Sequence, residues 1–113
     1  MTEKVFRDNR SMGRNELTRR LQDLLRVDEL IVIPTEPHDL FGHADGVLRF
    51  VDAGTVLIND YSTVARSYQR RLTKVLFRAG LEYHEIPYVP REERPGEVPP
   101  AFGCYTNFLW VGA

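Results

Sequence analysis

The sequence predicts an α/β fold in which helices alternate with short strands. Three observations lead to this prediction. A helical leucine stripe over residues 17–25 is followed at once by an apolar run at 30–33, two extended stretches flank a turn at 52–54, and a second helical stripe ends at Gly80. Helices that follow strands closely and are followed by them in turn are typical of α/β proteins.

Length and composition are those of one globular domain, which we take as residues 1–113. The side chains are 42% hydrophobic and 27% charged, which is too apolar for a disordered chain. Fifteen lysines and arginines stand against sixteen aspartates and glutamates, for a net charge of −1. This balance, with no continuous basic block, argues against an obligate nucleic-acid or anionic-membrane binder. We expect neither partner.

The sequence carries no signal for secretion or membrane insertion, and no pair of cysteines for a disulfide. No apolar run approaches the roughly 18 residues of a membrane-spanning helix. The start, M-T-E-K, lacks the basic and apolar regions of a signal peptide, so we expect a cytoplasmic protein. The single cysteine, Cys104, excludes an intrachain disulfide and a multi-cysteine zinc site.

The first helix and strand are predicted from the spacing of apolar residues. Asn15 is a suitable N-cap, and the four leucines of residues 17–25 recur at helical spacing. The run L-I-V-I at 30–33, stopped by Pro34, is continuous rather than alternating. Such a run favours a strand buried on both faces. Residues 35–42 are expected to form a loop.

The centre of the chain is predicted to be a hairpin followed by a helix. An extended stretch at 43–51, the turn D-A-G at 52–54 and a strand at 55–58 have the pattern of a hairpin. Ser62 can cap a second helix, and Gly80 stands where a C′ glycine ends one.

Two more strands are predicted around a proline-rich loop. Residues 83–89 read as a short strand and residues 105–111 as a last strand. Between them, residues 90–100 hold four prolines and are expected to be an exposed loop. The order of elements repeats one pattern and leaves its second copy incomplete.

The densest set of residues able to carry chemistry is P-H-D-L-F-G-H-A-D-G at 37–46. On a strand, His43 and Asp45 share one face, where an imidazole stands beside a carboxylate that can hold a cation. The flanking glycines permit an unusual φ angle or the close approach of a ligand. Asp39 also suits an Asx turn or a cap, and an isolated H-x-D pair is common in solvated turns.

Two other chemistries remain open from the residues alone. His38, His43 and Asp45 offer nitrogen and oxygen ligands for a metal, with His84 as a further ligand of unknown placement. Cys104 can be a nucleophile paired with His43, or a small buried residue at the start of a strand. The metal alternative lacks a ligand set of defined spacing.

The same residues resemble a known family. At 39–50, D-L-F-G-H-A-D-G-V-L-R-F is similar to the D-x-x-G-H-x-D…R-F signature of guanidine deiminases, specifically agmatine deiminase and the Porphyromonas-type peptidylarginine deiminase. Residues 7–33 resemble that family's asparagine- and arginine-bearing start, helix and strand. I-P-Y at 86–88 and Y-T-N-F-L at 105–109 resemble its later strands. The resemblance therefore covers nearly the whole chain, in order.

The resemblance implies a pentein, an α/β propeller of five ββαβ modules around a guanidine-binding channel. This chain would supply about two modules, with small mixed sheets and helices on the outer side. By resemblance His43 is the catalytic histidine that moves protons, and Asp45 and Asp39 are substrate-binding carboxylates. The family's cysteine attacks the guanidinium carbon, ammonia leaves, and water releases a ureido product. The resemblance implies no metal and no cofactor.

The sequence departs from the family in two segments. The family's nucleophile lies in a C-terminal G-G-x-H-C-type segment and a further carboxylate in an N-terminal W-x-R-D-type stretch, and neither pattern occurs here. Cys104 precedes Y-T-N-F, where relatives commonly carry a small residue, so it does not match that nucleophile. We therefore expect a partial deiminase for agmatine, peptidyl-arginine or another guanidino substrate, inactive alone. The alternative is a non-catalytic module that binds a guanidino ligand or forms a homo-oligomer through uncovered sheet edges.

Overall fold

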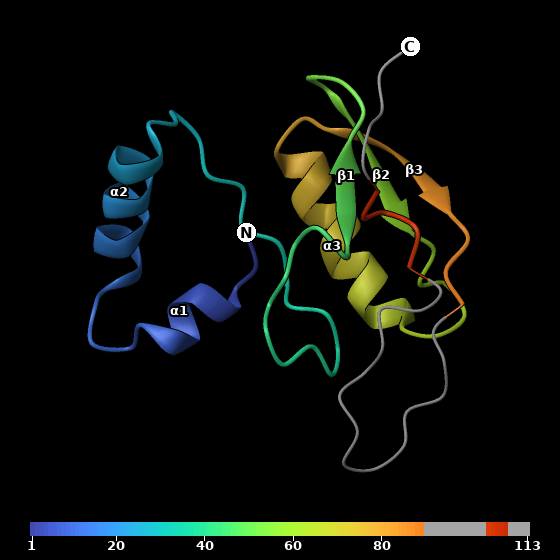
Figure 1. The fold of residues 1–113 in the computed structure, drawn as a ribbon, viewed down its shortest axis with the longest axis horizontal. Helices are drawn as coiled ribbons and strands as arrows, with labels where there is room; N and C mark the ends of the chain where they lie inside the picture. Colours follow the sequence, from blue (N-terminus) through green and yellow to red (C-terminus); the bar gives the residue numbers. More distant parts are fainter. Residues whose placement is uncertain (90–103, 109–113) are drawn as a thin grey trace.

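The structure, a computed structural model, describes residues 1–89 and 104–108 (Figure 1). Within them the elements follow in the order α1 (Lys4–Asp8), α2 (Arg14–Leu25), β1 (Leu48–Phe50), β2 (Thr55–Asn59), α3 (Arg66–Arg78) and β3 (Glu82–Ile86). The last four form a ββαβ unit, and Figure 1 shows α1 and α2 beside this unit rather than over its sheet. The prediction of an α/β fold is confirmed.

The sheet has the order β1-β2-β3 and is mixed. β1 and β2 are antiparallel, with Phe50 opposite Val56, whereas β2 and β3 are parallel, with Asn59 opposite Ile86. A parallel pair needs a long crossover, which α3 provides. The predicted hairpin is confirmed, and its turn is closed by the Gly54 N–H, which donates to Asp52 Oδ1 at 2.8 Å.

The hydrophobic core lies between the sheet and α3. The second helical stripe is confirmed in its centre, because Tyr68, Leu72 and Leu76 recur every four residues and are all buried. Val64, which stands four residues before Tyr68 and would continue the stripe at the same spacing, lies before the helix and is 51% exposed. The buried apolar side chains of this core are Ile33, Val47, Val56, Ile58, Tyr61, Tyr68, Leu72 and Leu76.

The end of α3 follows the sequence prediction closely. Gly80 has a φ of +69° and follows the C-cap Ala79. Its N–H donates to Phe77 O at 3.1 Å, and the Leu81 N–H donates to Leu76 O at 3.0 Å. These two bonds make a Schellman motif, in which a left-handed residue satisfies carbonyls of the last turn.

Both predicted N-caps are wrong. α2 begins one residue before Asn15, with Gly13 as N-cap and no side-chain cap bond. α3 begins at Arg66, four residues beyond Ser62. The Ser62 N–H instead donates to Asp60 Oδ1 at 2.8 Å, so this polar cluster forms an Asx turn ahead of the helix.

The strand predicted at 30–33 is also wrong. In its place is a single parallel bridge between Thr2 and Ile33. Ile33 donates its N–H to Met1 O at 2.9 Å and accepts the Glu3 N–H at 2.8 Å, so its partner is the short segment 1–3 rather than the sheet. Ile33 is nevertheless 2% exposed, because it packs into the core beside α3.

The remaining strands are shorter than predicted or lie elsewhere. The stretch at 43–51 becomes strand only from Leu48, and the strand expected at 83–89 runs from Glu82 to Ile86, where Pro87 follows. Of the last predicted strand, residues 105–108 are not strand and 109–111 lie outside the described residues, as do residues 90–100.

Candidate functional site

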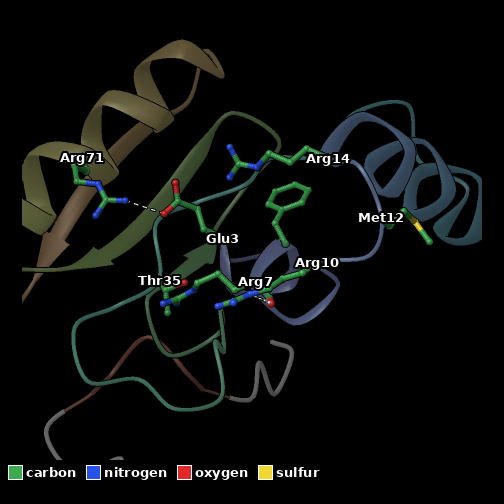
Figure 2. Close-up of a pocket in the computed structure, with 8 residues that line it drawn as sticks. Glu3, Arg7, Arg10, Met12, Arg14, Thr35 and Arg71 are labelled. Carbon is green, nitrogen blue, oxygen red and sulfur yellow. Dashed lines mark hydrogen bonds and ion pairs between the residues drawn. The ribbon is translucent and has the colours of Figure 1, made fainter.

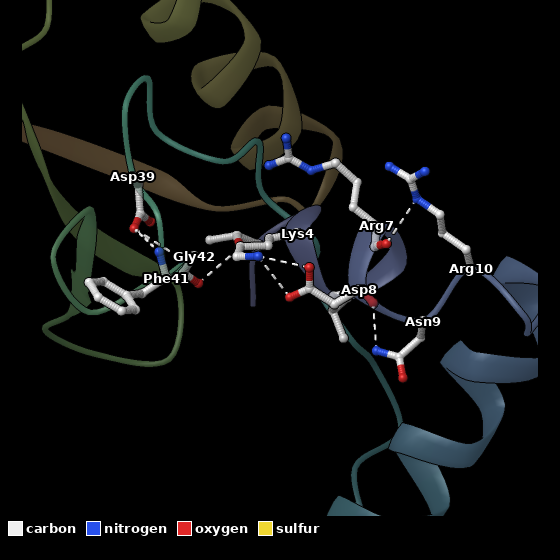
Figure 3. Close-up of polar contacts among 10 residues, drawn as sticks. Lys4, Arg7, Asp8, Asn9, Arg10, Asp39, Phe41 and Gly42 are labelled. Carbon is white, nitrogen blue, oxygen red and sulfur yellow. Dashed lines mark hydrogen bonds and ion pairs between the residues drawn. The ribbon is translucent and has the colours of Figure 1, made fainter. Parts of the chain in front are cut away.

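The loop that carries the candidate site is organised by Asp39. Its Oδ1 accepts the N–H groups of Phe41 at 2.8 Å and Gly42 at 2.9 Å (Figure 3). This is the Asx-type turn that the sequence allowed for Asp39. The other carboxylate oxygen, Oδ2, is buried and has no hydrogen-bond partner in the described part of the chain. Asp39 therefore builds the turn before His43 and keeps one oxygen unsatisfied.

Gly42 is required by its backbone conformation and by its neighbours. Its φ is +76°, and a Cβ at this position would lie 2.8 Å from Lys4 side-chain atoms and from Thr2 Oγ1. The Thr2 hydroxyl, which is buried, donates to Gly42 O at 2.8 Å. The unusual φ expected for the glycine of G-H-A-D is thus present, and the group that approaches closely is the N-terminal segment.

His43 and Asp45 do not lie on a strand, so the expectation that they share one face of it is wrong. The chain turns there because the N–H groups of Val47 and Leu48 both donate to Ala44 O, at 3.0 and 3.1 Å. Both site side chains are exposed, and no hydrogen bond joins one to the other. The His43 ring instead stacks on Phe41, with centroids 5.6 Å apart and planes inclined by 24°.

Asp45 is held by a segment from the far end of the chain. Asn107 Nδ2 donates to Asp45 Oδ2 at 3.0 Å, and Thr106 Oγ1 donates to the Asp45 carbonyl at 3.3 Å. Next to them, Cys104 Sγ donates to Gly46 O at 2.9 Å. Three side chains of residues 104–107 therefore fix both the backbone and the carboxylate of the Asp45 turn.

A second layer supports this turn from the core. Asn59, which is fully buried at the end of β2, donates through Nδ2 to Gly46 O at 2.7 Å and to the Tyr61 hydroxyl at 3.1 Å. The Arg49 guanidinium lies 5.0 Å from the centre of the Phe108 ring and so ties the 104–108 segment to β1.

Sequence reasoning missed the part that Asn59 and Asn107 have in the site. One signal was present for each: Asn59 interrupts the apolar run of its strand, and Asn107 stands within Y-T-N-F. The strand predicted at 55–58 stops short of Asn59, and Asn107 is predicted only as part of the last strand and of the Y-x-N-F resemblance. A buried polar residue at the end of an apolar strand needs a hydrogen-bond partner. For Asn59 that partner lies in the Asp45 turn.

A half-buried carboxyl group, that of Glu36, and three tyrosines lie behind the loop. Burial raises the pKa of Glu36, and repulsion from Asp39 adds to this, whereas hydrogen bonds from Tyr61 and Tyr88 oppose it. The Tyr88 hydroxyl is 2.9 Å from Glu36 Oε1. Burial also raises the pKa of Tyr61, as does the nearby Glu36, so its phenol stays protonated. The Tyr61 ring meets Tyr68 edge-on at 4.8 Å.

The metal alternative finds no support in the arrangement of its residues. Among residues 1–89 and 104–108, no three His, Cys, Asp or Glu side chains gather closely enough to hold a metal ion. His38 lies in the loop with a φ of +66°, and His84 lies on β3 opposite Leu57.

The pairing of Cys104 with His43 is not seen either. Cys104 contacts Gly46, Asn59 and Thr106 rather than His43.

No helix in the part of the chain that the structure describes is both long enough and apolar enough to cross a bilayer.

Solved structures share this fold. Agmatine deiminase from C. jejuni superposes with a TM-score of 0.74 at 17% sequence identity, over 98% of this chain and 35% of that enzyme. A variant of the C. jejuni enzyme with its substrate bound gives a TM-score of 0.69 at 18% identity, over 91% of this chain and 32% of the variant. The chain thus has the fold of part of agmatine deiminase and spans about a third of the length of these structures.

The family is shown by the sequence as a whole. No curated protein matches the chain significantly. The profile of the Porphyromonas-type peptidyl-arginine deiminase family, in contrast, matches residues 1–113, which is the full length given. The D-x-x-G-H-x-D and Y-x-N-F resemblances predicted this family. The chain belongs to the Porphyromonas-type peptidyl-arginine deiminase family.

Proposed function

We propose that this chain forms part of a guanidine deiminase, in which Asp45 holds the substrate guanidinium and His43 moves protons. The observation that carries the proposal is the exposed Asp45 carboxylate, fixed by Asn107 and standing two residues from the exposed His43 ring. A planar guanidinium donates two parallel hydrogen bonds to a carboxylate of fixed orientation. Asn107 binds one oxygen of Asp45 and so sets the plane in which the guanidinium would lie.

Proton movement suits His43 because its ring is accessible and its orientation is set. The stack on Phe41 restricts the imidazole plane, and both ring nitrogens belong to an exposed side chain. In a deiminase, this group would take a proton from the attacking water and give one to the departing ammonia. Asp39 would act on substrate through its unsatisfied oxygen, or solely by shaping the turn.

The nucleophile of the reaction is expected from outside this chain. Cys104 Sγ donates its proton to Gly46 O, a bond that a thiolate cannot make. We therefore infer that Cys104 supports the Asp45 turn, and that a cysteine from the remaining two thirds of a complete enzyme attacks the guanidinium carbon. In a propeller of five modules, the unit from β1 to β3 would be one ββαβ module.

The test measures binding and turnover with the purified chain. We expect no ureido product from agmatine or an arginine peptide, but calorimetric binding of agmatine in preference to putrescine, which lacks the guanidinium. Asp45→Asn should weaken agmatine binding about tenfold or more, since it removes a charge-assisted pair. Asp28→Asn, a change of equal charge at an exposed residue away from the loop, should leave it unchanged.

Two results would contradict the proposal. Equal agmatine affinity of the Asp45→Asn variant and the wild-type chain would remove the role of Asp45. Turnover by the chain alone would show that the nucleophile is present, and loss of that turnover in Cys104→Ser would then identify Cys104.

The non-catalytic alternative has one observation in its favour. Large apolar side chains are exposed on two helices, with Leu24 on α2 77% exposed and Phe77 on α3 83% exposed. Such surfaces often mark contacts between chains. Light scattering that shows a dimer or larger ring would support a self-associating module, and a monomer at high concentration would contradict it.

A further inference from the structure

An arginine-lined groove lies apart from the candidate deiminase site. It occupies about 580 Å³ between α1, the start of α2, Thr35 and α3 (Figure 2). It shares no lining residue with the Asp45 turn. The residues that line it are Glu3, Phe6, Arg7, Arg10, Met12, Arg14, Thr35 and Arg71.

The groove carries an excess of positive charge. Four guanidinium groups face one carboxylate, and that carboxylate is engaged, because Glu3 Oε2 lies 2.8 Å from Arg71 Nη2. Arg7, Arg10 and Arg14 form no ion pair with any residue in the described ranges. Like charges held together on one surface repel one another, and a bound anion relieves that repulsion.

The arginines are oriented by the fold rather than freely extended. Arg10 Nε donates to the Arg7 carbonyl at 3.2 Å, and the Arg14 guanidinium lies 4.4 Å from the centre of the Phe6 ring. A guanidinium whose stem is fixed loses less side-chain entropy when it binds a ligand. The side chains of Arg10 and Arg14 are therefore partly pre-organised for binding an anion.

Thr35 gives an independent indication of a polar ligand. Its hydroxyl oxygen is buried and has no hydrogen-bond partner in the part of the chain described, although Thr35 lines the groove. A buried hydroxyl without a partner is costly, and an oxygen of a ligand in the groove would accept its proton.

We propose that this groove binds the polyphosphate group of a small molecule, such as pyrophosphate or a nucleotide. Phosphate oxygens accept parallel hydrogen bonds from the guanidinium fork, and a polyphosphate concentrates several negative charges in one compact group. The volume lies within the roughly 300–1,000 Å³ of small-molecule sites. Phe6 supplies an apolar surface for whatever the phosphates carry.

Calorimetry of the purified chain with pyrophosphate tests the proposal. Ionic strength is set to about 0.15 M, where charges more than about 8 Å apart are largely screened. We expect one pyrophosphate per chain. Arg7→Gln and Arg10→Gln should each weaken binding by about ten- to a hundredfold, and Thr35→Val by severalfold. Arg19→Gln is the matched control, since Arg19 is an exposed arginine of α2 outside the groove.

Each alternative outcome overturns the proposal. Absence of binding, or equal weakening by Arg19→Gln and Arg10→Gln, would mean that the groove has no specific site. Tighter binding of citrate than of pyrophosphate would replace the phosphate with a carboxylate ligand. Circular dichroism spectra that match the wild type would show that the variants fold, as expected for exposed arginines.

Discussion

Replacement of Gly42 by alanine tests how the G-H-A-D turn is built. A left-handed conformation costs a non-glycine residue about 1–2 kcal/mol. The new Cβ would also lie 2.8 Å from Thr2 Oγ1 and from Lys4. Thr2 is buried, and if displaced it loses a hydrogen bond worth about 1 kcal/mol net. Together these effects predict that Gly42→Ala lowers the free energy of unfolding by about 2–4 kcal/mol.

Gly46 in the same motif is the matched control. It has no positive φ, and a Cβ there would meet no atom within 4 Å. Gly46→Ala should therefore be neutral or stabilise by about 0.4–1 kcal/mol, because alanine restricts the unfolded chain. Urea unfolding followed by far-ultraviolet circular dichroism measures both, with a slope of about 1–3 kcal/mol per molar urea. A Gly42→Ala variant as stable as the wild type, or equal losses in the two variants, would refute this account.

Two further predictions concern Glu36 and the core helix α3. Because the folded chain holds the Glu36 proton more tightly than the unfolded chain, stability should fall as pH rises from the ordinary value near 4.5 through the raised pKa. Glu36→Gln should flatten this fall in urea titrations, and an unchanged pH profile would speak against a protonated Glu36. Leu72→Ala, in the fully buried stripe of α3, should cost about 2–5 kcal/mol. Phe77→Ala, on the exposed face of α3, should change the free energy of unfolding by less than about 0.5 kcal/mol. Similar losses of stability in Leu72→Ala and Phe77→Ala would contradict the packing described.

Features encoded by a few adjacent residues were predictable from the sequence. The D-A-G turn and Gly80 each need only local chemistry, and both lie where expected. The caps at Asn15 and Ser62 failed because polar residues also form turns, and tertiary packing decides where a helix starts. The apolar run at 30–33 is partly buried, as such runs usually are, but its pairing depends on residues 1–3, which no local pattern reveals.

The candidate site was likewise predictable only in those parts that a local motif encodes. The motif indicated where His43 and Asp45 lie, and the turn around them was not predicted. Asn107, which holds Asp45, is remote from it in sequence. Arg71 is likewise remote from the other three arginines of the groove, which all lie within residues 7–14. The sequence showed arginines spread along the chain, and only the fold brings four of them together.

The contact between Asp45 and Asn107 has a consequence for the order in which the molecule assembles. The two residues are 62 positions apart, and closing a chain segment of that length costs roughly 4 kcal/mol of configurational entropy. The Asp45–Asn107 hydrogen bond returns only about 1 kcal/mol, so by itself it does not offset this cost. We therefore expect the contact to form after the β2–α3–β3 core has closed most of that distance, and the 104–108 segment to dock on the Asp45 turn late in folding. The Asp45 side chain therefore acquires its fixed orientation only when the rest of the domain is in place, and we expect partial opening of the domain to break the Asp45–Asn107 contact early.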